Sequence, residues 1–279
     1  MEFIRLATGA SMPLLGFGTY LIKDLAVCER AVGDALEAGY RLIDTAQFYG
    51  NEEAVGRAIR HSGVPRGELF VTTKLWISDM SEEKAAPAFG RSLERLGMDY
   101  VDLYLLHHPF GDVYGAWRAA QRFFRDGRAR AIGVSNFYAD RVTDLALNNE
   151  IRPHVDQLET HPYHQRREME PTLAEYGTAH QAWGPFSQGK TDLLENPVLK
   201  AIGEKHGKTT AQVCLRWLTQ RGVCALPKST HKARIRENFQ IFDFRLSASD
   251  MAAIALLDTG KPAGMPHTDP NNIKRIYAM

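Results

Sequence analysis

Short runs of the kind that form β-strands alternate with longer segments of helical period along most of the chain. The runs lie at 14–17, 41–44, 69–73, 100–106, 131–134, 155–158, 180–183 and 223–226. In the segments between them, apolar residues recur every three to four positions, at 25–38, 51–61, 81–96, 117–125, 139–147, 169–176, 199–206, 211–220 and 233–239. The first pattern is typical of buried strands and the second of amphipathic helices.

The two ends of the chain depart from this alternation. Residues 3–6 and the segment from Met12 onward predict a β-hairpin, because Gly9 lies in the polar turn between them. Residues 249–257 predict one extra helix after the last strand–helix unit. The tail at 262–279 is rich in Pro, Asn and Gly, and we expect it to form a loop.

Eight strands, each followed by a helix, predict an α/β protein built as a closed (β/α)8 TIM barrel. The chain has 279 residues, which suits one such barrel of roughly 250 residues. We therefore expect a single domain over residues 1–279, with an N-terminal hairpin and an extra C-terminal helix and tail. The alternative is an open, doubly wound sheet. It is disfavoured because the first strand-to-helix turn, at 16–20, lacks the Gly-x-Gly-x-x-Gly pattern of a dinucleotide-binding turn.

The composition of the chain gives no reason to expect nucleic acid, a membrane or a metal as partner. Hydrophobic residues make up 44% of the chain and charged residues 24%, and the net charge is only +1. A charge near zero gives no reason to expect nucleic acid or an anionic membrane as partner. The three cysteines form no Cys-x-x-Cys pair, so neither a disulfide framework nor a thiolate metal site is predicted. With no long apolar run and no signal peptide at the start, we expect a monomeric cytoplasmic protein without a metal.

Three predicted strands lead into four side chains that can do chemistry: Asp44, with Tyr49 five residues on, Lys74 and His107. In a parallel barrel the carboxyl ends of the strands meet at one mouth. An ammonium beside a phenol lowers its pKa from about 10, and a carboxylate keeps the ammonium charged and oriented. This set suits general acid catalysis at a carbonyl oxygen. Each residue alone has an ordinary structural explanation, and their joint placement favours catalysis.

Seven segments of the chain resemble the aldo-keto reductase family. They are GYRLIDTA at 39–46, YGNE at 49–52, TKLW at 73–76, DYVDLYLLH at 99–107, GVSNF at 133–137, DQLETHP at 156–162 and LPKS at 226–229. The resemblance extends from about residue 6 to residue 257 in the same order. AWGP at 182–185 is similar to bacterial members of the 2,5-diketo-gluconate reductase type. The resemblance implies a (β/α)8 barrel that uses NADPH to reduce aldehydes and ketones, with the nicotinamide carrying the hydride.

The same resemblance implies roles for individual residues. Tyr49 would be the general acid, Lys74 would lower its pKa, Asp44 would pair with Lys74, and His107 would orient the carbonyl. Ser135, Asn136 and Gln157 would bind the nicotinamide carboxamide, and the nicotinamide ring would stack on Trp183. Phe186, Gln188 and Gly189 would lie near the pyrophosphate. The adenosine end and its 2′-phosphate would contact Lys228, Ser229, Thr230, Arg234, Glu237 and Asn238.

A Lys-Ser-Thr run that enters a helix is also an anion site on chemical grounds, because backbone N–H groups, hydroxyls and cations converge there. Lys228 and Arg234 together favour NADPH over NADH, since the 2′-phosphate is the group that needs both. Lys232 and Arg236 are expected instead on an ordinary basic helix face.

Four residues are predicted to bind the substrate: Tyr20, Trp76, His108 and Phe110. Two of them depart from the family pattern, since many relatives carry Trp where this chain has Tyr20 and His108. The segment at 110–117 is short, so we expect an open mouth. Small aldehydes, α-ketoaldehydes and keto sugars are the expected substrates.

Two other functions remain open at this point. One is a non-enzymatic relative that binds NADPH and serves a partner, as potassium-channel β-subunits do, although the intact catalytic set argues against it. The other is a barrel lyase or aldolase that forms a Schiff base on Lys74. The predicted anion site at Lys228 and the aromatic Trp183 argue for a nicotinamide cofactor instead.

Overall fold

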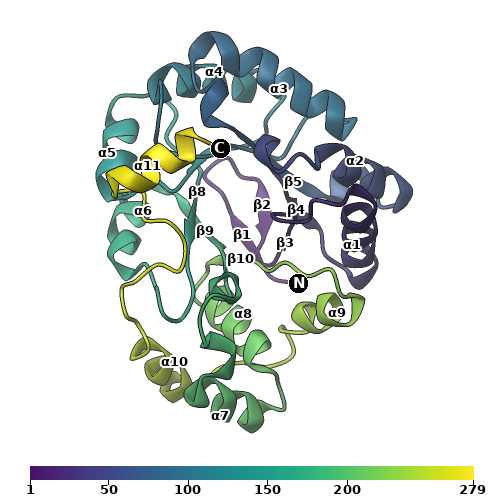
Figure 1. Cartoon of the computed structure of the whole chain (residues 1–279), viewed down its shortest axis with the longest axis vertical. Helices are drawn as coiled ribbons and strands as arrows, with labels where there is room; N and C mark the ends of the chain where they lie inside the picture. Colours follow the sequence, from purple (N-terminus) through teal and green to yellow (C-terminus); the bar gives the residue numbers. More distant parts are fainter.

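The computed structural model describes residues 1–279 and confirms the barrel (Figure 1). Eight parallel strands lie side by side in the order of the sequence. They are β3 (Phe17–Gly18), β4 (Leu42–Asp44), β5 (Phe70–Leu75), β6 (Leu103–Leu106), β7 (Ile132–Ser135), β8 (Val155–Glu159), β9 (Ala179–Trp183) and β10 (Cys224–Leu226). The barrel closes where a parallel bridge joins Leu15 to Ala225. Because residues 14–16 make this closure, β3 itself is shorter than, and shifted from, the predicted strand at 14–17.

The predicted hairpin covers the N-terminal end of the barrel. Strands β1 (Phe3–Arg5) and β2 (Ser11–Pro13) pair antiparallel. Leu6, Met12 and Leu14 are buried against the first interior side chains of the barrel strands, in one cluster. These strand residues are Leu42, Phe70, Leu103, Ala131, Val155, Ala179 and Cys224. Figure 1 shows the hairpin across the centre of the barrel. The N-terminal end of the barrel is therefore filled with apolar side chains. A functional site can form only at the C-terminal end.

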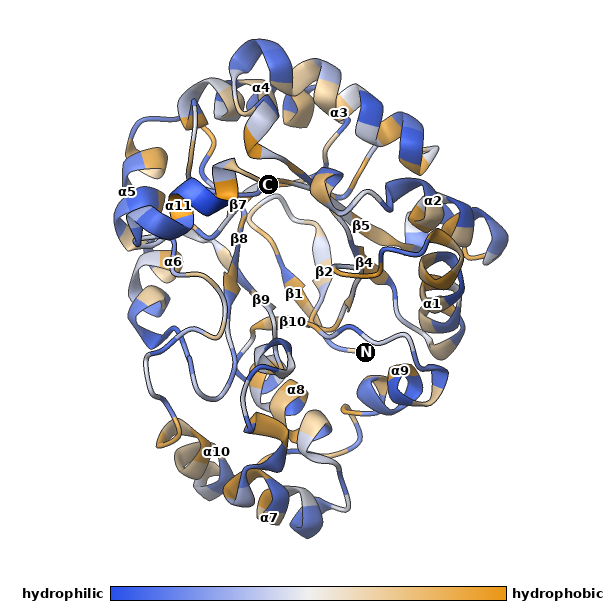
Figure 2. Ribbon diagram, in the orientation of Figure 1, coloured by the Kyte–Doolittle hydropathy of each residue, from blue (hydrophilic) through white to orange (hydrophobic).

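Eleven helices accompany the strands. They are α1 (Leu25–Ala38), α2 (Glu52–His61), α3 (Glu82–Leu96), α4 (Val113–Arg125), α5 (Ala139–Leu147), α6 (Glu170–Tyr176), α7 (Pro197–His206), α8 (Thr210–Gln220), α9 (Lys232–Phe239), α10 (Ala248–Ala255) and α11 (Pro270–Tyr277). Figure 2 shows both hydrophobic and hydrophilic residues on these helices, as the amphipathic period predicts. Helix α1 ends at Gly39, whose φ of 108° is strained for any other residue. None of the helices is long and apolar enough to cross a bilayer.

One prediction about local structure is wrong. The tail is not a loop throughout, because residues 270–277 form α11, which begins behind the cap Asp269 and buries Ile276. Asn51 stands at the start of α2 but does not cap it. Its buried amide instead donates to the carbonyls of Thr19 and Ile22 and accepts from the Thr45 hydroxyl. Asn51 therefore connects the loops after β3 and β4.

The extra helix predicted at 249–257 is confirmed as α10.

Candidate active site

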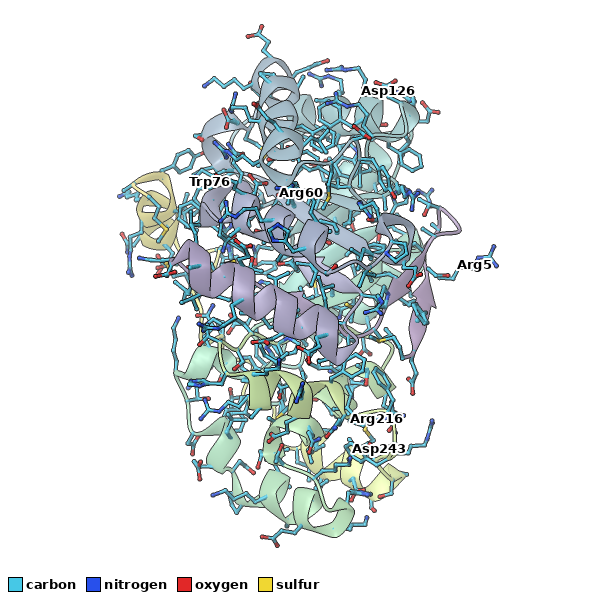
Figure 3. All side chains as sticks on the ribbon, turned by 90° about the vertical axis from the view of Figure 1, so that its right-hand side faces the viewer. Arg5, Arg60, Trp76, Asp126, Arg216 and Asp243 are labelled. Carbon is cyan, nitrogen blue, oxygen red and sulfur yellow. The ribbon has the colours of Figure 1, made fainter.

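The two-residue alternation of the strands decides which side chains enter the barrel. Leu42 and Asp44 share one face of β4, and Phe70, Thr72 and Lys74 share one face of β5. Because Leu42 and Phe70 lie in the interior cluster, Asp44 and Lys74 also point inward, one or two layers nearer the C-terminal end. The same two-residue alternation, starting from the interior residues Ala131, Val155 and Ala179, points Ser135, Gln157 and Trp183 inward from β7, β8 and β9. Figure 3 shows the two ends of the barrel, with Trp76 beside α11 at one and Arg5 of the hairpin at the other.

Asp44, Lys74 and Tyr49 form one hydrogen-bonded group, as the sequence predicts. The fully buried ammonium of Lys74 donates to Asp44 Oδ1 at 2.6 Å, to the Thr45 carbonyl at 2.9 Å and to Tyr49 Oη at 3.3 Å. Its three donors are all used. The ammonium is thus enclosed by oxygens, and this geometry does not favour a Schiff-base lyase.

A polar column continues from Asp44 down the barrel axis. The Gln157 amide donates to Asp44 Oδ2 at 2.8 Å and to Gln181 Oε1 at 2.7 Å. Gln181 in turn reaches Met12 Sδ of the hairpin at 3.7 Å. Both carboxylate oxygens of Asp44 therefore have charged or polar partners, which fixes the orientation of the group that holds Lys74.

The pKa of Tyr49 differs from the sequence-based expectation. Burial, followed by the charge of Asp44, raises the pKa of this phenol well above its usual value. The prediction that Lys74 lowers it is therefore wrong for the net shift. Burial also lowers the pKa of Lys74, while Asp44 opposes that change. A phenol with a raised pKa keeps its proton in the neutral range.

His107 lies beside Tyr49, as expected. The two rings are 5.6 Å apart at 71°, and the backbone N–H of His107 donates to the Leu75 carbonyl at 3.1 Å. Burial lowers the pKa of His107 well below its usual value, and the neighbouring His108 and Lys74 lower it further. His107 is therefore a neutral imidazole at neutral pH, able to donate one N–H without adding charge.

A cavity of about 420 Å³ opens at this end of the barrel. Fourteen of the residues predicted for the site line it: Tyr20, Asp44, Tyr49, Trp76, His107, His108, Ser135, Asn136, Gln157, Trp183, Phe186, Gln188, Gly189 and Lys228. Phe110 does not line the cavity and lies behind His108, with ring centroids 6.0 Å apart.

The C-terminal segment contributes lining residues that the sequence did not reveal. Met265, His267, Ile276 and Met279 face the cavity, and Phe48 lies on the opposite segment with its ring stacked 3.9 Å from Trp76. The mouth is therefore partly covered by residues 265–279, where the sequence predicted an open one. No local pattern marks these residues, because their place depends on how the tail folds back over the barrel.

Asn136 and Trp183 are joined at the other end of the cavity. The Trp183 indole N–H donates to Asn136 Oδ1 at 2.9 Å, and the Asn136 amide donates to the His107 carbonyl at 3.1 Å. Asn136 has a left-handed φ of 64°, a conformation that Asn tolerates better than most residues. The Ser135 hydroxyl donates to the Gln157 carbonyl at 2.9 Å. These contacts connect the ends of β6, β7, β8 and β9.

The cations before and within α9 divide into two kinds. Lys232 pairs with Asp34 and Glu37, and Arg236 pairs with Glu37, so both lie on an ordinary basic helix face as expected. Lys228 and Arg234 are exposed and have no carboxylate partner. Thr230 is half-buried next to them, and the buried Ser229 hydroxyl accepts from the His231 N–H at 3.1 Å. Two unpaired cations at a helix start suit a phosphate. Of the two other predicted residues, Glu237 accepts from the Thr209 hydroxyl at 2.8 Å and Asn238 is buried.

The fold and the site define a barrel oxidoreductase with a phenol, an ammonium and an imidazole at a cavity beside a phosphate-type anion site. Residues 15–258 match the model of the Aldo/keto reductase family. The chain is 45% identical to glyoxal reductase of Bacillus subtilis, covering 96% of each chain. It is 44% identical to 9,11-endoperoxide prostaglandin H2 reductase of Trypanosoma cruzi, covering 96% of this chain and 95% of the relative.

A solved structure agrees with both the fold and the cofactor. The aldo-keto reductase of Bombyx mori in complex with NADP superimposes with a TM-score of 0.91 at 36% identity, covering 98% of this chain and 96% of that one. The chain therefore belongs to the aldo/keto reductase family, as the sequence predicted. It is an oxidoreductase that uses NADP(H) and acts on carbonyl compounds.

The residues present fit that cofactor. The cavity extends from Tyr49 and His107, past Trp183 and the loop at 184–190, to Lys228. Gly184 and Gly189 both have left-handed φ, and a Cβ on Gly189 would meet nothing within 4 Å. This loop therefore leaves room for a long ligand to pass between the phenol and the unpaired cations.

Proposed function

We propose that this protein reduces aldehydes and ketones with NADPH, and that Tyr49 is the general acid. The observation that carries the proposal is the position of the Tyr49 hydroxyl, 3.3 Å from Lys74 Nζ and beside the neutral imidazole of His107. When bound, the cofactor supplies the hydride to the carbonyl carbon. Tyr49 gives its proton to the carbonyl oxygen, and the oxygen receives a second hydrogen bond from His107.

The charges around Tyr49 serve the proton transfer. Once the proton leaves, the phenolate oxygen lies within hydrogen-bond reach of the Lys74 ammonium, which stabilises the new negative charge. Asp44 keeps that ammonium protonated and in place in spite of its burial. The neutral His107 orients the carbonyl without competing as a proton source, because its own pKa is held low by burial.

We assign the cofactor contacts from the family resemblance and the geometry together. Ser135, Asn136 and Gln157 would hold the carboxamide, and Trp183 would carry the ring. Phe186, Gln188 and Gly189 would follow the pyrophosphate. Because the Asn136 amide and carbonyl already have partners in the chain, its hydrogen bonds would have to be shared with the cofactor. Lys228, Ser229, Thr230 and Arg234 would bind the 2′-phosphate, and Glu237 and Asn238 would lie at the adenine.

Small aldehydes, α-ketoaldehydes and keto sugars are the substrates we propose. The relative from Bacillus subtilis is named a glyoxal reductase, which supports the small dicarbonyl compounds. The direct test is NADPH oxidation with a panel that includes methylglyoxal, nitrobenzaldehyde and 2,5-diketo-gluconate. Turnover of at least one aldehyde with NADPH is expected, while cofactor binding without any turnover would instead indicate a protein that serves a partner.

Removing the two unpaired cations should weaken NADPH selectively. We expect Lys228→Gly combined with Arg234→Ala to raise the KM for NADPH by at least about 100-fold, since two charge-assisted hydrogen bonds are worth about 1.5–3 kcal/mol each. The KM for NADH should change little. The matched control is Lys232→Ala with Arg236→Ala, whose cations already pair with Asp34 and Glu37. Equal losses for NADPH and NADH would contradict the phosphate assignment.

We also infer that the enzyme works as a cytoplasmic monomer and does not bind nucleic acid or membranes. The near-zero net charge and the three free, buried cysteines support this inference. Size-exclusion chromatography with light scattering checks the oligomeric state.

A further inference from the structure

A buried carboxylate fixes the C-terminal segment beside the cavity. Glu159, at the end of β8, accepts from the backbone N–H groups of Ala263 and Gly264 through Oε1, at 2.7 and 3.0 Å. A Cβ on Gly264 would lie 2.7 Å from the Trp183 ring and 2.8 Å from Glu159 Oε2. The chain thus passes in close contact with both residues at this point, and its position sets where the following residues lie.

His267 follows three residues later and meets His108 across the cavity wall. The two side chains share a hydrogen bond of 2.8 Å between His108 Nδ1 and His267 Nε2, and their ring centroids are 4.9 Å apart. His108 also stacks on His107 at 4.9 Å with only 4° between the planes. Both His108 and His267 line the same cavity as Tyr49. We call these two residues the imidazole pair.

The imidazole pair is neutral at neutral pH. Burial lowers the pKa of His108 well below its usual value and that of His267 to about 4. The charged groups that face the pair oppose one another, because Lys74 and Arg166 lower these pKa values while Glu159 raises that of His267. Each ring therefore carries one N–H, and one of those two protons lies in the hydrogen bond between them.

The remaining nitrogens have complementary roles. His108 Nε2 and His267 Nδ1 make no hydrogen bond within the chain. If His267 donates to His108, then His108 Nε2 is the free donor and His267 Nδ1 the free acceptor. If His108 donates, both roles exchange. The pair can thus offer either a donor or an acceptor to a polar group in the cavity, at no cost in charge.

We propose that His267, through this pair with His108, is a specificity-determining residue that binds a neutral hydrogen-bonding group of the substrate away from its carbonyl. The proposal rests on the proposed carbonyl reduction at Tyr49. It narrows the substrates to neutral carbonyl compounds that carry a hydroxyl, ether or nitro oxygen. The only charged side chains that line the cavity are Asp44, Lys190 and Lys228. A neutral pair gives no counter-charge to a carboxylate, so at this position a carboxylate gains nothing over a neutral hydroxyl group.

The test compares ratios of kcat/KM between variants, because these ratios cancel the intrinsic reactivity of each aldehyde. The substrates are benzaldehydes that carry a methyl, hydroxyl, nitro or carboxylate group at the 3- or 4-position. We expect His267→Phe to lower kcat/KM about three- to tenfold for a hydroxyl or nitro isomer, mainly through KM. The methyl compounds should change less than twofold. His267→Gln, which keeps a donor and an acceptor, should recover most of the loss.

The control variant is Tyr277→Phe, which lies on the same segment, half-exposed and outside the cavity lining. It should leave all the ratios unchanged. Equal losses in His267→Phe for methyl and polar substrates, without recovery by His267→Gln, would show a packing role and overturn the proposal, as would no change at all. If the unmodified enzyme reduces none of these aldehydes with NADPH, the proposed function itself fails, before any variant is compared.

Discussion

Replacing Tyr49 by Phe is expected to lower kcat by roughly 10²- to 10⁴-fold, the usual contribution of a positioned general acid. The phenyl ring keeps the packing against Tyr20 and His107, whose ring centroids lie 4.9 and 5.6 Å away. Only the proton that the carbonyl oxygen needs is lost. The affinity for NADPH, measured by fluorescence titration, should therefore stay within about twofold, since the hydroxyl is not among its proposed contacts.

Tyr104→Phe is the matched control for this variant. Tyr104 is fully buried, whereas Tyr49 is half-buried at the cavity. The Tyr104 hydroxyl has no hydrogen-bond partner, and its side chain points away from the barrel interior, towards Phe89 and Phe123. Removing the Tyr104 hydroxyl should leave kcat unchanged. The raised pKa of Tyr49 adds a second check, because kcat for reduction should not fall between about pH 7 and 9 through loss of the donor proton. Normal turnover by Tyr49→Phe would exclude it as the acid.

Replacing Lys74 by Met is expected to damage both activity and stability. Met has a similar length but cannot donate, so Asp44 would remain buried with its charge no longer matched by the ammonium at 2.6 Å. Breaking a buried ion pair on one side costs about 3–5 kcal/mol. We expect the free energy of unfolding, measured by urea titration, to fall by that amount. Turnover should fall at least as far as in Tyr49→Phe, because the phenolate loses its counter-charge.

The double variant Asp44→Asn with Lys74→Met separates the two effects. With both charges gone, the Asn can still accept the hydrogen bond from Gln157, and much of the lost stability should return. Activity should not return, since nothing then stabilises the phenolate. Recovery of turnover in the double variant would show that Lys74 acts only through the fold.

The barrel and the grouping of Asp44, Tyr49, Lys74 and His107 at one end of it could be predicted because both follow from short-range patterns. The two-residue alternation that buries Leu42 and Phe70 also points Asp44 and Lys74 inward, so one pattern gives both the core and the site. The direction of the Tyr49 pKa shift could not be predicted in the same way. The sequence places an ammonium beside the phenol, but how deeply both are buried is set by the packing of the whole barrel.

The place of the C-terminal segment, by contrast, could not be predicted from short-range patterns. Asp269 followed by Pro270 is a valid helix-start signal, but the Pro and Asn content of the tail points to a loop, so the local signals conflict. The contact between His108 and His267 joins residues 159 apart in the sequence. It depends on Glu159 holding the chain at Ala263 and Gly264, which only the folded structure reveals.

The polar column that joins Met12, Gln181, Gln157, Asp44, Lys74 and Tyr49 has a consequence for how such an enzyme can diversify. Each member fills a hydrogen-bonding position of its neighbour, so a change at one leaves a buried group of the next without its partner. Mutations along the column should therefore be tolerated only in compensating sets. The residues at the mouth have no such hydrogen-bond linkage to Tyr49, the proposed proton donor. Single substitutions at the mouth can therefore change which substrates bind. The residues of the column, in contrast, are expected to be retained together.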